Sequence, residues 1–263
     1  MNILNEVIDF LENEKEQSKY TNISPGVYRD FKKNVALILE EEKGGEKPNA
    51  KPVLPHKGYI PVENQKPAKF QGSCPSPDQS KITDMTIEEL KNTVCECTKC
   101  VLHQSRKNVV FGEGNVNADL MFIGEGPGRD EDLHGRPFVG QSGQLLTKMI
   151  KAMGYERSEV YIANIVKCRP PYNRNPNPDE GKYCLNYLNR QIELIKPKVL
   201  VLLGAVPLSF LLDKRGITRL HGQWHEYMGI KTMPSFHPAY LLRDPSQKKY
   251  AWEDLQKVMK VLQ

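Results

Sequence analysis

The stretch KVLVLLG at residues 198–204 is the most apolar segment of the sequence. Its valines and leucines follow one another without a polar residue, which is typical of a strand buried on both faces of a parallel sheet. Largely apolar stretches occur at residues 119–124 and 160–165, a final strand is expected at residues 230–234, and sequence with helical periodicity separates these segments. Strands that alternate with helices indicate a parallel sheet covered on both sides. We therefore expect an α/β protein with three α/β/α layers around a central, mostly parallel four-stranded sheet.

The expected helices carry start and stop signals of their own. They are expected to end near residues 94, 153, 195, 212 and 262. Thr86 and Glu89 predict a capping box at the first helix, Gly154 stops the second, and NPDE at residues 177–180 caps the third. Ligands of such a sheet bind at the carboxyl ends of the parallel strands, so we look for a site in the loops that follow them.

The sequence divides into three parts. Residues 1–44 predict two helices and form a small helical N-terminal extension, while residues 45–82 contain seven prolines and predict an extended linker. The main domain is expected to span residues 83–263. Because two short helices bury little surface alone, residues 1–44 are a candidate contact region for a protein partner that no motif identifies.

Charge and hydropathy narrow the class of protein. The 263 residues carry a formal net charge of +5, which divides into −3 for residues 1–44 and +8 for the remainder. A basic main part favours an anionic partner, nucleic acid first, although solubility alone would explain the same charge. No apolar run is long enough to span a bilayer, and the first residues lack the pattern of a signal peptide. We expect a cytoplasmic monomer without a membrane partner.

Four cysteines form a candidate metal site. They are Cys97, Cys100, Cys168 and Cys184. The first two make a C-x2-C pair and the others follow in a distant segment, and thiolates from two such segments can together hold a metal. Disulfides are not expected in a cytosolic chain. Spacing alone does not separate zinc from an iron–sulfur cluster, and Cys95 lies close enough to Cys100 to compete with Cys97.

Three polar loops follow the expected strands. GEGPG at residues 124–128 has glycines that let a ligand approach the backbone, although a tight strand-to-helix connection would use the same residues. Asn164 ends the next strand, and His237 follows the last one. Since carboxyl ends of parallel strands share one edge of the sheet, these groups together indicate a site.

Four motifs and the four cysteines give the chain a family resemblance. The motifs are GEGPGRDED at 124–132, GRPFVGQSGQLL at 135–146, NIVKCRPPYNRNPNPDE at 164–180 and HPAYLLR at 237–243. From about residue 90 onward the chain resembles a family 4 uracil-DNA glycosylase, the iron–sulfur branch of that superfamily. The resemblance implies a base excision repair enzyme that flips uracil out of DNA and hydrolyses its N-glycosidic bond. It implies a [4Fe–4S] cluster on the four cysteines, and it says nothing of residues 1–82.

The resemblance also implies a uracil pocket. Phe138 would stack on the flipped base, and Asn164 would hydrogen-bond to its Watson–Crick edge. The amide suits O4 and N3–H of uracil, and cytosine presents the opposite pattern. Glu131 matches an acidic residue near C5 of the base. His237 would face O2 and stabilise the departing uracil anion.

The first loop departs from the best-known uracil glycosylases, which carry an aspartate there to position the attacking water. Gly126 stands at that place, and with Glu125 it would contact the uracil. The water-positioning residue stays open among Glu125, Asp130, Glu131 and Asp132. We expect His237, Glu125 and Asn164 to be catalytic. Because no lysine is placed as a nucleophile, the enzyme would leave an abasic site without cutting the strand.

Contacts to DNA are expected beside this pocket. The resemblance implies that residues 239–243 enter the DNA, where Leu241 with Leu242 would fill the vacated stack, although a buried helix start would explain the same pair. Arg169, Arg174 and Arg243 are candidates for phosphate contacts.

Two other functions fit parts of the pattern. One is a protein of the same fold that binds uracil-containing DNA without turnover, and the intact Phe138, Asn164 and His237 argue against it. The other is a zinc-stapled nucleic-acid-binding module without chemistry, which iron in the purified protein would exclude.

Overall fold

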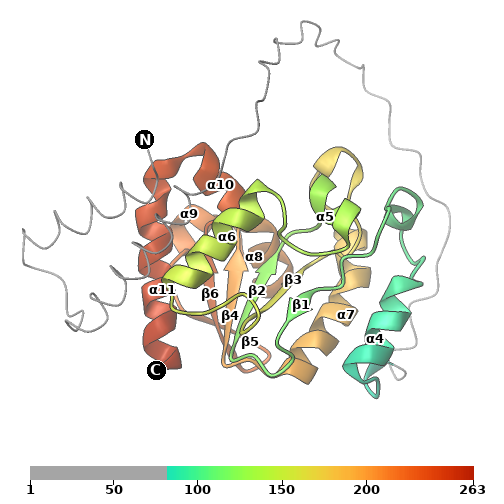
Figure 1. The fold of residues 1–263 in the computed structure, drawn as a ribbon, viewed down its shortest axis with the longest axis horizontal. Coiled ribbons are helices and arrows are strands. Elements are labelled where there is room, and N and C mark those ends of the chain that lie inside the picture. Colours follow the sequence, from blue (N-terminus) through green and yellow to red (C-terminus); the bar gives the residue numbers. More distant parts are fainter. Residues whose placement is uncertain (1–81) are drawn as a thin grey trace, which may run out of the picture. The chain divides into compact units, whose positions relative to one another are not determined.

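The computed structural model of the protein describes residues 82–263, and in this part of the chain six strands form one sheet (Figure 1). The strands are β1 (Glu113–Gly114), β2 (Leu120–Gly124), β3 (Tyr161–Asn164), β4 (Val199–Leu203), β5 (His225–Tyr227) and β6 (Ile230–Ser235). Their order is β1-β3-β2-β4-β6-β5, and the central four, β3, β2, β4 and β6, run parallel. The predicted four-stranded parallel core is confirmed.

Two short antiparallel strands extend this core at its edges. β1 pairs with β3 and β5 pairs with β6. Strands of two or three residues carry too few alternating positions to be seen in a sequence pattern, so the expected number of strands was too low by these two.

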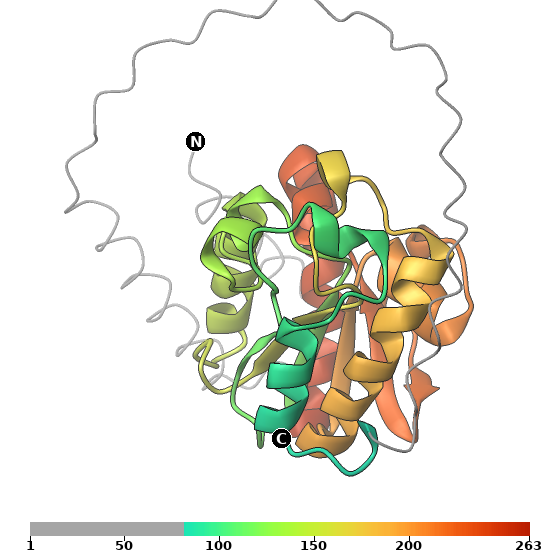
Figure 2. The same ribbon diagram turned by 90° about the vertical axis from the view of Figure 1, so that its right-hand side faces the viewer.

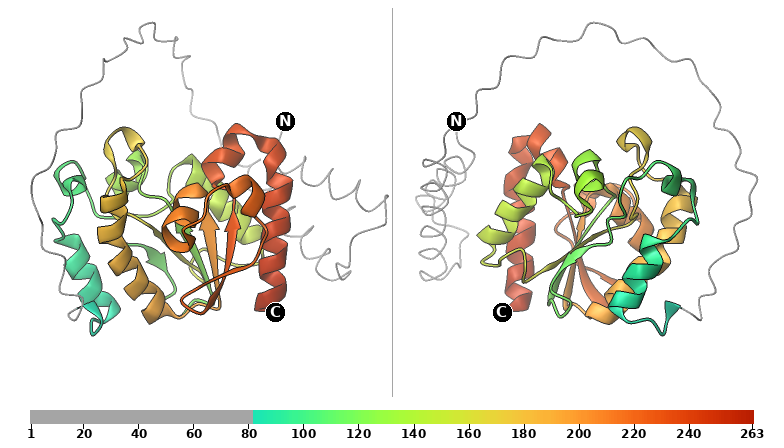
Figure 3. Two further views of the ribbon diagram at one scale, coloured as in Figure 1. Left: turned by 180° about the vertical axis from the view of Figure 1, so that it is seen from behind. Right: turned by 45° about the vertical axis from the view of Figure 1, so that its right-hand side comes forward.

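Helices cover both faces of the sheet. The longer ones are α4 (Ile87–Cys95), α6 (Gln141–Ala152), α7 (Pro178–Ile195), α8 (Ala205–Leu212) and α11 (Lys248–Leu262). In Figure 3, α6 and α11 lie on one face of the sheet and α7 lies on the other. Figure 2 shows α4 alongside α7, on the side away from the strands. The three-layer arrangement is the expected one.

The two faces of β4 show how the apolar stretch builds this core. Leu200 and Leu202 pack toward α7 and α8, whereas Val199, Val201 and Leu203 pack toward α6 and α11. All five side chains are fully buried. Burial of one such side chain stabilises the fold by about 1.5–3 kcal/mol, so this strand anchors both layers.

Local signals place the ends of the helices as expected. Thr86 and Glu89 form the capping box of α4, and Asn177 and Glu180 form that of α7. Gly154 follows α6 with φ of +87°, a conformation that glycine adopts without strain.

Several short helices lie outside the expected pattern. They are α5 (Arg129–His134), α9 (Ile217–Leu220), α10 (Pro238–Arg243), η1 (Val101–Gln104), η2 (Pro171–Asn173) and η3 (Pro245–Gln247). With three to six residues each, they are too short for a periodic apolar pattern. α5 and α10 matter most, because they begin directly after the loops that were expected to form the site.

The predicted helices of residues 1–44 lie outside the described residues, as does the predicted linker except for its last residue. Ile82 is buried with Leu90, Val94 and Tyr187, and therefore belongs to the core. Among residues 82–263, none of the helices combines the length and the apolar character that crossing a bilayer requires.

Candidate active site

The candidate site lies at the carboxyl ends of β2 and β3. Gly124 and Asn164 are the last residues of these strands and are paired in register. A Cβ on Gly124 would lie 2.5 Å from Oδ1 of Asn164 and 2.5 Å from Cζ of Phe138. Only a glycine leaves room for both neighbours, so the predicted amide and the predicted aromatic ring meet at this point.

His237 completes this group from the end of β6. Its ring centroid lies 5.6 Å from that of Phe138, with the two planes tilted by 32°. The structure therefore brings Phe138, Asn164 and His237 together from three separate segments. Phe138 comes from the loop between α5 and α6, and its side chain is buried.

Asn164 offers an unused hydrogen-bonding atom at the site. The residue is only 2% exposed, yet its Oδ1 has no hydrogen-bond partner among the described residues. A buried polar atom without a partner costs about 1–3 kcal/mol, and most buried polar atoms have one. The amide is thus arranged for a ligand that donates a hydrogen bond.

The surroundings of His237 favour a neutral ring with its proton on Nε2. Nδ1 accepts a hydrogen bond from the backbone N–H of Ala239 at 3.1 Å, so Nδ1 carries no proton. Burial, together with the charge of Arg243, lowers the pKa of His237 to about 4, although the nearby Glu131 opposes the shift. Near neutral pH this histidine is a hydrogen-bond donor through Nε2 and carries no charge.

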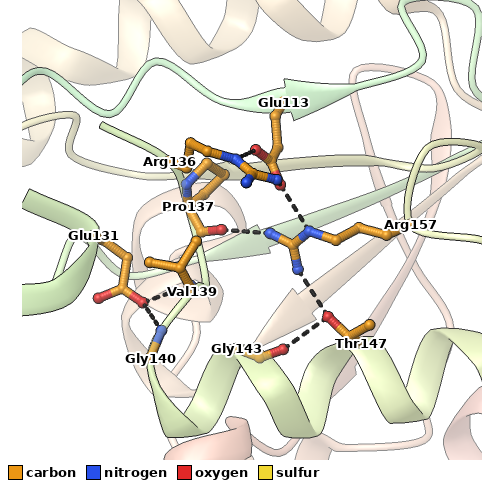
Figure 4. Close-up of polar contacts among 9 residues, drawn as sticks. All are labelled: Glu113, Glu131, Arg136, Pro137, Val139, Gly140, Gly143, Thr147 and Arg157. Carbon is orange, nitrogen blue, oxygen red and sulfur yellow. Dashed lines mark hydrogen bonds and ion pairs between the residues drawn. The ribbon is translucent and has the colours of Figure 1, made fainter. Parts of the chain in front are cut away.

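Glu131 is buried and fully engaged with the backbone. Its Oε1 accepts from the N–H groups of Val139 at 2.8 Å and Gly140 at 2.9 Å (Figure 4). Its Oε2 accepts from the N–H of Gly128 at 3.1 Å. The carboxylate therefore holds the loop that carries Phe138. These three bonds leave it little capacity to orient a water molecule.

The other acidic candidates of the first loop differ in their exposure and in their hydrogen bonds. Asp132 is buried and accepts from the N–H of Lys107 at 2.8 Å, so it also holds a loop, whereas Asp130 is exposed. Glu125 is partly exposed, and its carboxylate makes no hydrogen bond with the described residues. Burial raises the pKa of Glu125, since no cation offsets the loss of solvent.

Gly126 serves the packing of the first loop. A Cβ there would lie 2.6 Å from Cγ2 of Val166, just beyond β3. The N–H of Val166 donates to the carbonyl of Glu125 at 3.1 Å. The loop after β2 is thus bound to the loop after β3, which keeps Glu125 beside Asn164.

The four predicted cysteines line one pocket. Its wall also includes the basic residues Lys99, His103, Arg106 and Lys167. All four thiols are free, and Cys95 is exposed and is not part of the wall. The geometry therefore favours the predicted set over the alternative with Cys95.

The chemistry of this pocket suits an electron-poor group held by thiolates. Burial raises the pKa of Cys100 to about 11 and that of Cys184 to about 12, so these sulfurs need a positive partner to lose their protons. Arg106 donates to Sγ of Cys168 at 3.2 Å. Among the described residues, no group of three or more His, Cys, Asp or Glu side chains is arranged to hold a metal ion. The fit of these residues to a metal-bearing group therefore rests on the four thiols that line one pocket.

The expected DNA contacts need a correction at one residue. Leu241 on α10 is 1% exposed and packs with Phe236 and Ala251, whereas Leu242 is 37% exposed. Because α10 turns Leu241 into the core, the predicted wedge has Leu242 as its accessible member. Arg243 is also exposed.

The two other arginines hold their own loop. Arg174 makes two bonds to the buried carboxylate of Glu180, at 2.8 and 2.7 Å, and Arg169 donates to Oδ1 of Asn173 at 2.8 Å. Their guanidinium groups are partly occupied by these partners, so Arg243 is better placed to meet a phosphate.

Sequence reasoning missed two basic residues beside the cysteines. Arg106 donates to the carbonyl of Cys97 at 2.7 Å as well as to Cys168. The fully buried Lys167 donates to the carbonyl of Asn164 at 3.0 Å, which connects the cysteine pocket with the candidate site. The position of Lys167 directly before a predicted ligand was the one signal in the sequence.

Comparison with known proteins agrees with this architecture. The model of the uracil DNA glycosylase superfamily matches residues 111–256. The chain is 49% identical over 181 residues to the type-4 uracil-DNA glycosylase of Thermotoga maritima, covering 65% of this chain and 94% of that protein. It is 45% identical over 183 residues to the type-4 uracil-DNA glycosylase of Sulfurisphaera tokodaii, covering 66% and 83%. The corresponding protein of Archaeoglobus fulgidus is 40% identical over 182 residues, covering 66% and 92%. The chain therefore belongs to the uracil-DNA glycosylase superfamily and, within it, to the type-4 family.

Proposed function

We propose that this chain is a DNA repair enzyme that removes uracil from DNA by hydrolysing the bond between the base and the sugar. The abasic site that remains is a substrate for later repair. The observation that carries the proposal is the buried, unpartnered Oδ1 of Asn164 beside the rings of Phe138 and His237. A flat base with a hydrogen-bond donor fits this arrangement.

Recognition rests on stacking and on the amide. Extruding a base from a duplex costs a few kcal/mol, and stacking on an aromatic ring returns about 1–3 kcal/mol, which is the role we assign to Phe138. Oδ1 of Asn164 accepts from N3–H of uracil while Nδ2 donates to O4. Cytosine carries an acceptor and a donor at these two positions, so it would leave both amide atoms unpaired in a buried place.

Catalysis rests on stabilising the leaving base. The bond between sugar and base breaks through an oxocarbenium-like state, and the uracil leaves as an anion with charge on O2 and O4. A neutral His237 donates from Nε2 to this charge. Loss of one such preorganised donor costs about 2.7–4 kcal/mol of transition-state stabilisation.

Glu125 is the carboxylate that we assign to the attacking water. The carboxylates of Glu131 and Asp132 accept hydrogen bonds from backbone N–H groups, and Asp130 is exposed. Glu125 alone combines partial burial with a carboxylate that the described residues leave unbound. We assign Gly126, the next residue of the same loop, to the contact with the base through its backbone.

The cofactor we propose is a [4Fe–4S] cluster on Cys97, Cys100, Cys168 and Cys184. When bound, it would join the segment around η1 to the end of β3 and to α7 without taking part in the reaction. The basic side chains in the wall of the pocket would offset its negative charge.

Uracil-containing DNA is the proposed partner, and the chain would act on it as a monomer in the cytoplasm. Leu242 and Arg243 on α10 are the contacts we assign to the duplex, with Arg169 and Arg174 beside them. Residues 1–44 remain the proposed region for a protein partner.

The test is an excision assay with the purified, iron-containing protein. Oligonucleotides with a single uracil, cytosine or thymine are incubated with it, and alkali then cleaves any abasic site. We expect cleavage at uracil only. Asn164→Asp, which replaces the amide donor by a carboxylate, should abolish most of this activity and is the variant in which weak cytosine excision is expected. Retention of the DNA without any base release would instead indicate a binding protein.

A further inference from the structure

Phe138 has a backbone conformation that its neighbours must hold. Its φ is +51°, in the left-handed region that is unfavourable for residues with a side chain. Gly143 on α6 packs so closely against it that a Cβ there would collide with the carbonyl of Phe138. The direction of the ring therefore depends on how the peptide groups around Phe138 are fixed.

Charged side chains bind the backbone on both sides of Phe138 (Figure 4). After Phe138 in the sequence, the N–H groups of Val139 and Gly140 donate to the carboxylate of Glu131. Before Phe138, the carbonyl of Pro137 accepts from the guanidinium of Arg157. The loop is thus held by an anion after the aromatic residue and by a cation before it.

Arg157 is itself held by two further residues. Its Nε donates to Oε1 of Glu113 at 2.7 Å, and its Nη1 donates to the hydroxyl of Thr147 at 3.2 Å. The pair of Arg157 and Glu113 is largely shielded, with side-chain exposures of 18% and 20%. A shielded charge pair with several bonds has a defined geometry, unlike an exposed pair.

Glu113 connects this contact to the strand that carries Asn164. It lies on β1 and is paired in register with Ile162 of β3, two residues before Asn164. A path of direct contacts therefore runs from β3 through Glu113 and Arg157 to the peptide that precedes Phe138. The positions of the Phe138 ring and of the Asn164 amide therefore both depend on the pair β1 and β3.

We propose that Arg157, oriented by Glu113, is a positioning residue for base excision. It fixes Phe138 relative to Asn164, so that a base between them meets the ring and the amide at once. The inference rests on the proposed function, since it assigns Arg157 to that same site. Arg157 acts through the backbone and makes no contact with the base.

The first test removes the guanidinium while keeping an apolar stem. In Arg157→Met, the single-turnover rate of uracil excision should fall about 10- to 100-fold, because a displacement of about 1 Å has costs of this order. Affinity for uracil-containing duplex should change less than about twofold, because phosphate contacts dominate it. Arg157→Lys retains one donor and should restore part of the rate.

A double-mutant cycle shows whether the effect passes through Phe138. In a Phe138→Ala background, Arg157→Met should lower the rate by less than about twofold, since the group that it positions is gone. Full additivity of the two losses would contradict the inference. Should Arg157→Met not fold, the same cycle with Glu113→Gln decides, because this variant keeps one acceptor oxygen for Arg157 but loses the charge and the second acceptor, which binds Arg136.

Arg190 provides a matched control. It lies on α7, donates to the carbonyl of Met85 at 2.8 Å, pairs with Glu193 at 3.1 Å and has 17% of its side chain exposed. Arg190→Met should lower the melting temperature about as much and leave the excision rate unchanged. An inactive parental protein would count against the proposed function. An active parent with equal rates in Arg157→Met and Arg190→Met would overturn the positioning inference alone.

Discussion

Asn164 and Gly124 stand opposite each other at the ends of β3 and β2, and the amide oxygen of Asn164 lies 2.5 Å from where a Cβ of residue 124 would be. The ring of Phe138 reaches the same point. The absence of one side chain at Gly124 therefore creates the space in which an aromatic ring and an amide can face one ligand.

Gly124→Ala should lower the rate of uracil excision far more than it lowers the stability of the fold. The added methyl group must displace Asn164 and Phe138, so we expect uracil excision to fall about 100-fold, with a loss of stability of about 1–3 kcal/mol. Single-turnover kinetics and thermal unfolding measure the two effects. Gly154→Ala is the control, because residue 154 has φ of +87° and open space around it, so it should lose stability only. An unchanged rate in Gly124→Ala would mean that the base binds elsewhere.

His237 should contribute to the pH dependence of the stability of the protein. Burial lowers its pKa to about 4 from an ordinary value near 6.5, so the folded state disfavours the charged ring. Below pH 6.5 the unfolded chain takes up this proton first, and stability is lost as the pH falls from 6.5 toward 4. His237→Ala should remove that part of the acid sensitivity and should lower the excision rate by ~100-fold or more.

The same shift predicts the pH profile of the reaction. Between pH 5 and 8 the excision rate of the parental enzyme should show no step that His237→Ala abolishes, because the ring stays neutral throughout. A rate that rises as the pH falls through 6.5, and no longer does so in the variant, would show that the charged imidazolium, and not the neutral ring, takes part.

Apolar runs were enough to predict β2, β3 and β4, because every residue of these strands is buried, whereas β6 begins with the partly buried Ile230 and the exposed Lys231. Asn164 and His237 could be placed at the site because Asn164 ends β3 and His237 lies two residues after the end of β6. The short elements were different. β1, α5 and α10 are too small to carry a pattern, yet they bear Glu113, Glu131 and Leu241.

The arrangement around Phe138 could not be derived from local sequence. Arg157 lies 20 positions from Pro137 and 44 from Glu113, and no spacing rule connects residues so far apart. Likewise, without α10 the two adjacent leucines are equivalent in the sequence. Only the turn of the helix decides which of them packs in the core.

The cysteine pocket predicts a selective response to substitution. Cys97→Ser and Cys184→Ser should lower the iron content and the melting temperature, because each removes one of the thiolates in the wall of the pocket. Cys95→Ser should keep both, since Cys95 is exposed and outside the wall. Iron analysis and visible absorbance measure the outcome. Bleaching by Cys95→Ser but not by Cys97→Ser would reverse the assignment.

Arg243 and Arg174 should contribute differently to the salt dependence of the affinity for DNA. A phosphate contact contributes about −0.9 to the slope of log affinity against log salt on duplex DNA. Arg243→Ala should make the slope shallower by about that amount, because Arg243 is exposed. Arg174→Ala should change it less, because its guanidinium already pairs with Glu180. Equal changes in both variants would show that Arg174 leaves Glu180 when DNA binds.

Leu241 and Leu242 form a matched pair within one helix. Leu241→Ala opens a cavity in the core and should cost about 2–5 kcal/mol of stability. Leu242→Ala removes an exposed side chain and should leave the melting temperature nearly unchanged. If Leu242 fills the stack that a flipped base vacates, its loss should slow excision from duplex DNA by about 10-fold and from single-stranded DNA far less, because a single strand has less stacking to replace. Single-turnover rates on both substrates measure this ratio. Equal slowing on the two would assign Leu242 to the pocket for the base and not to the duplex.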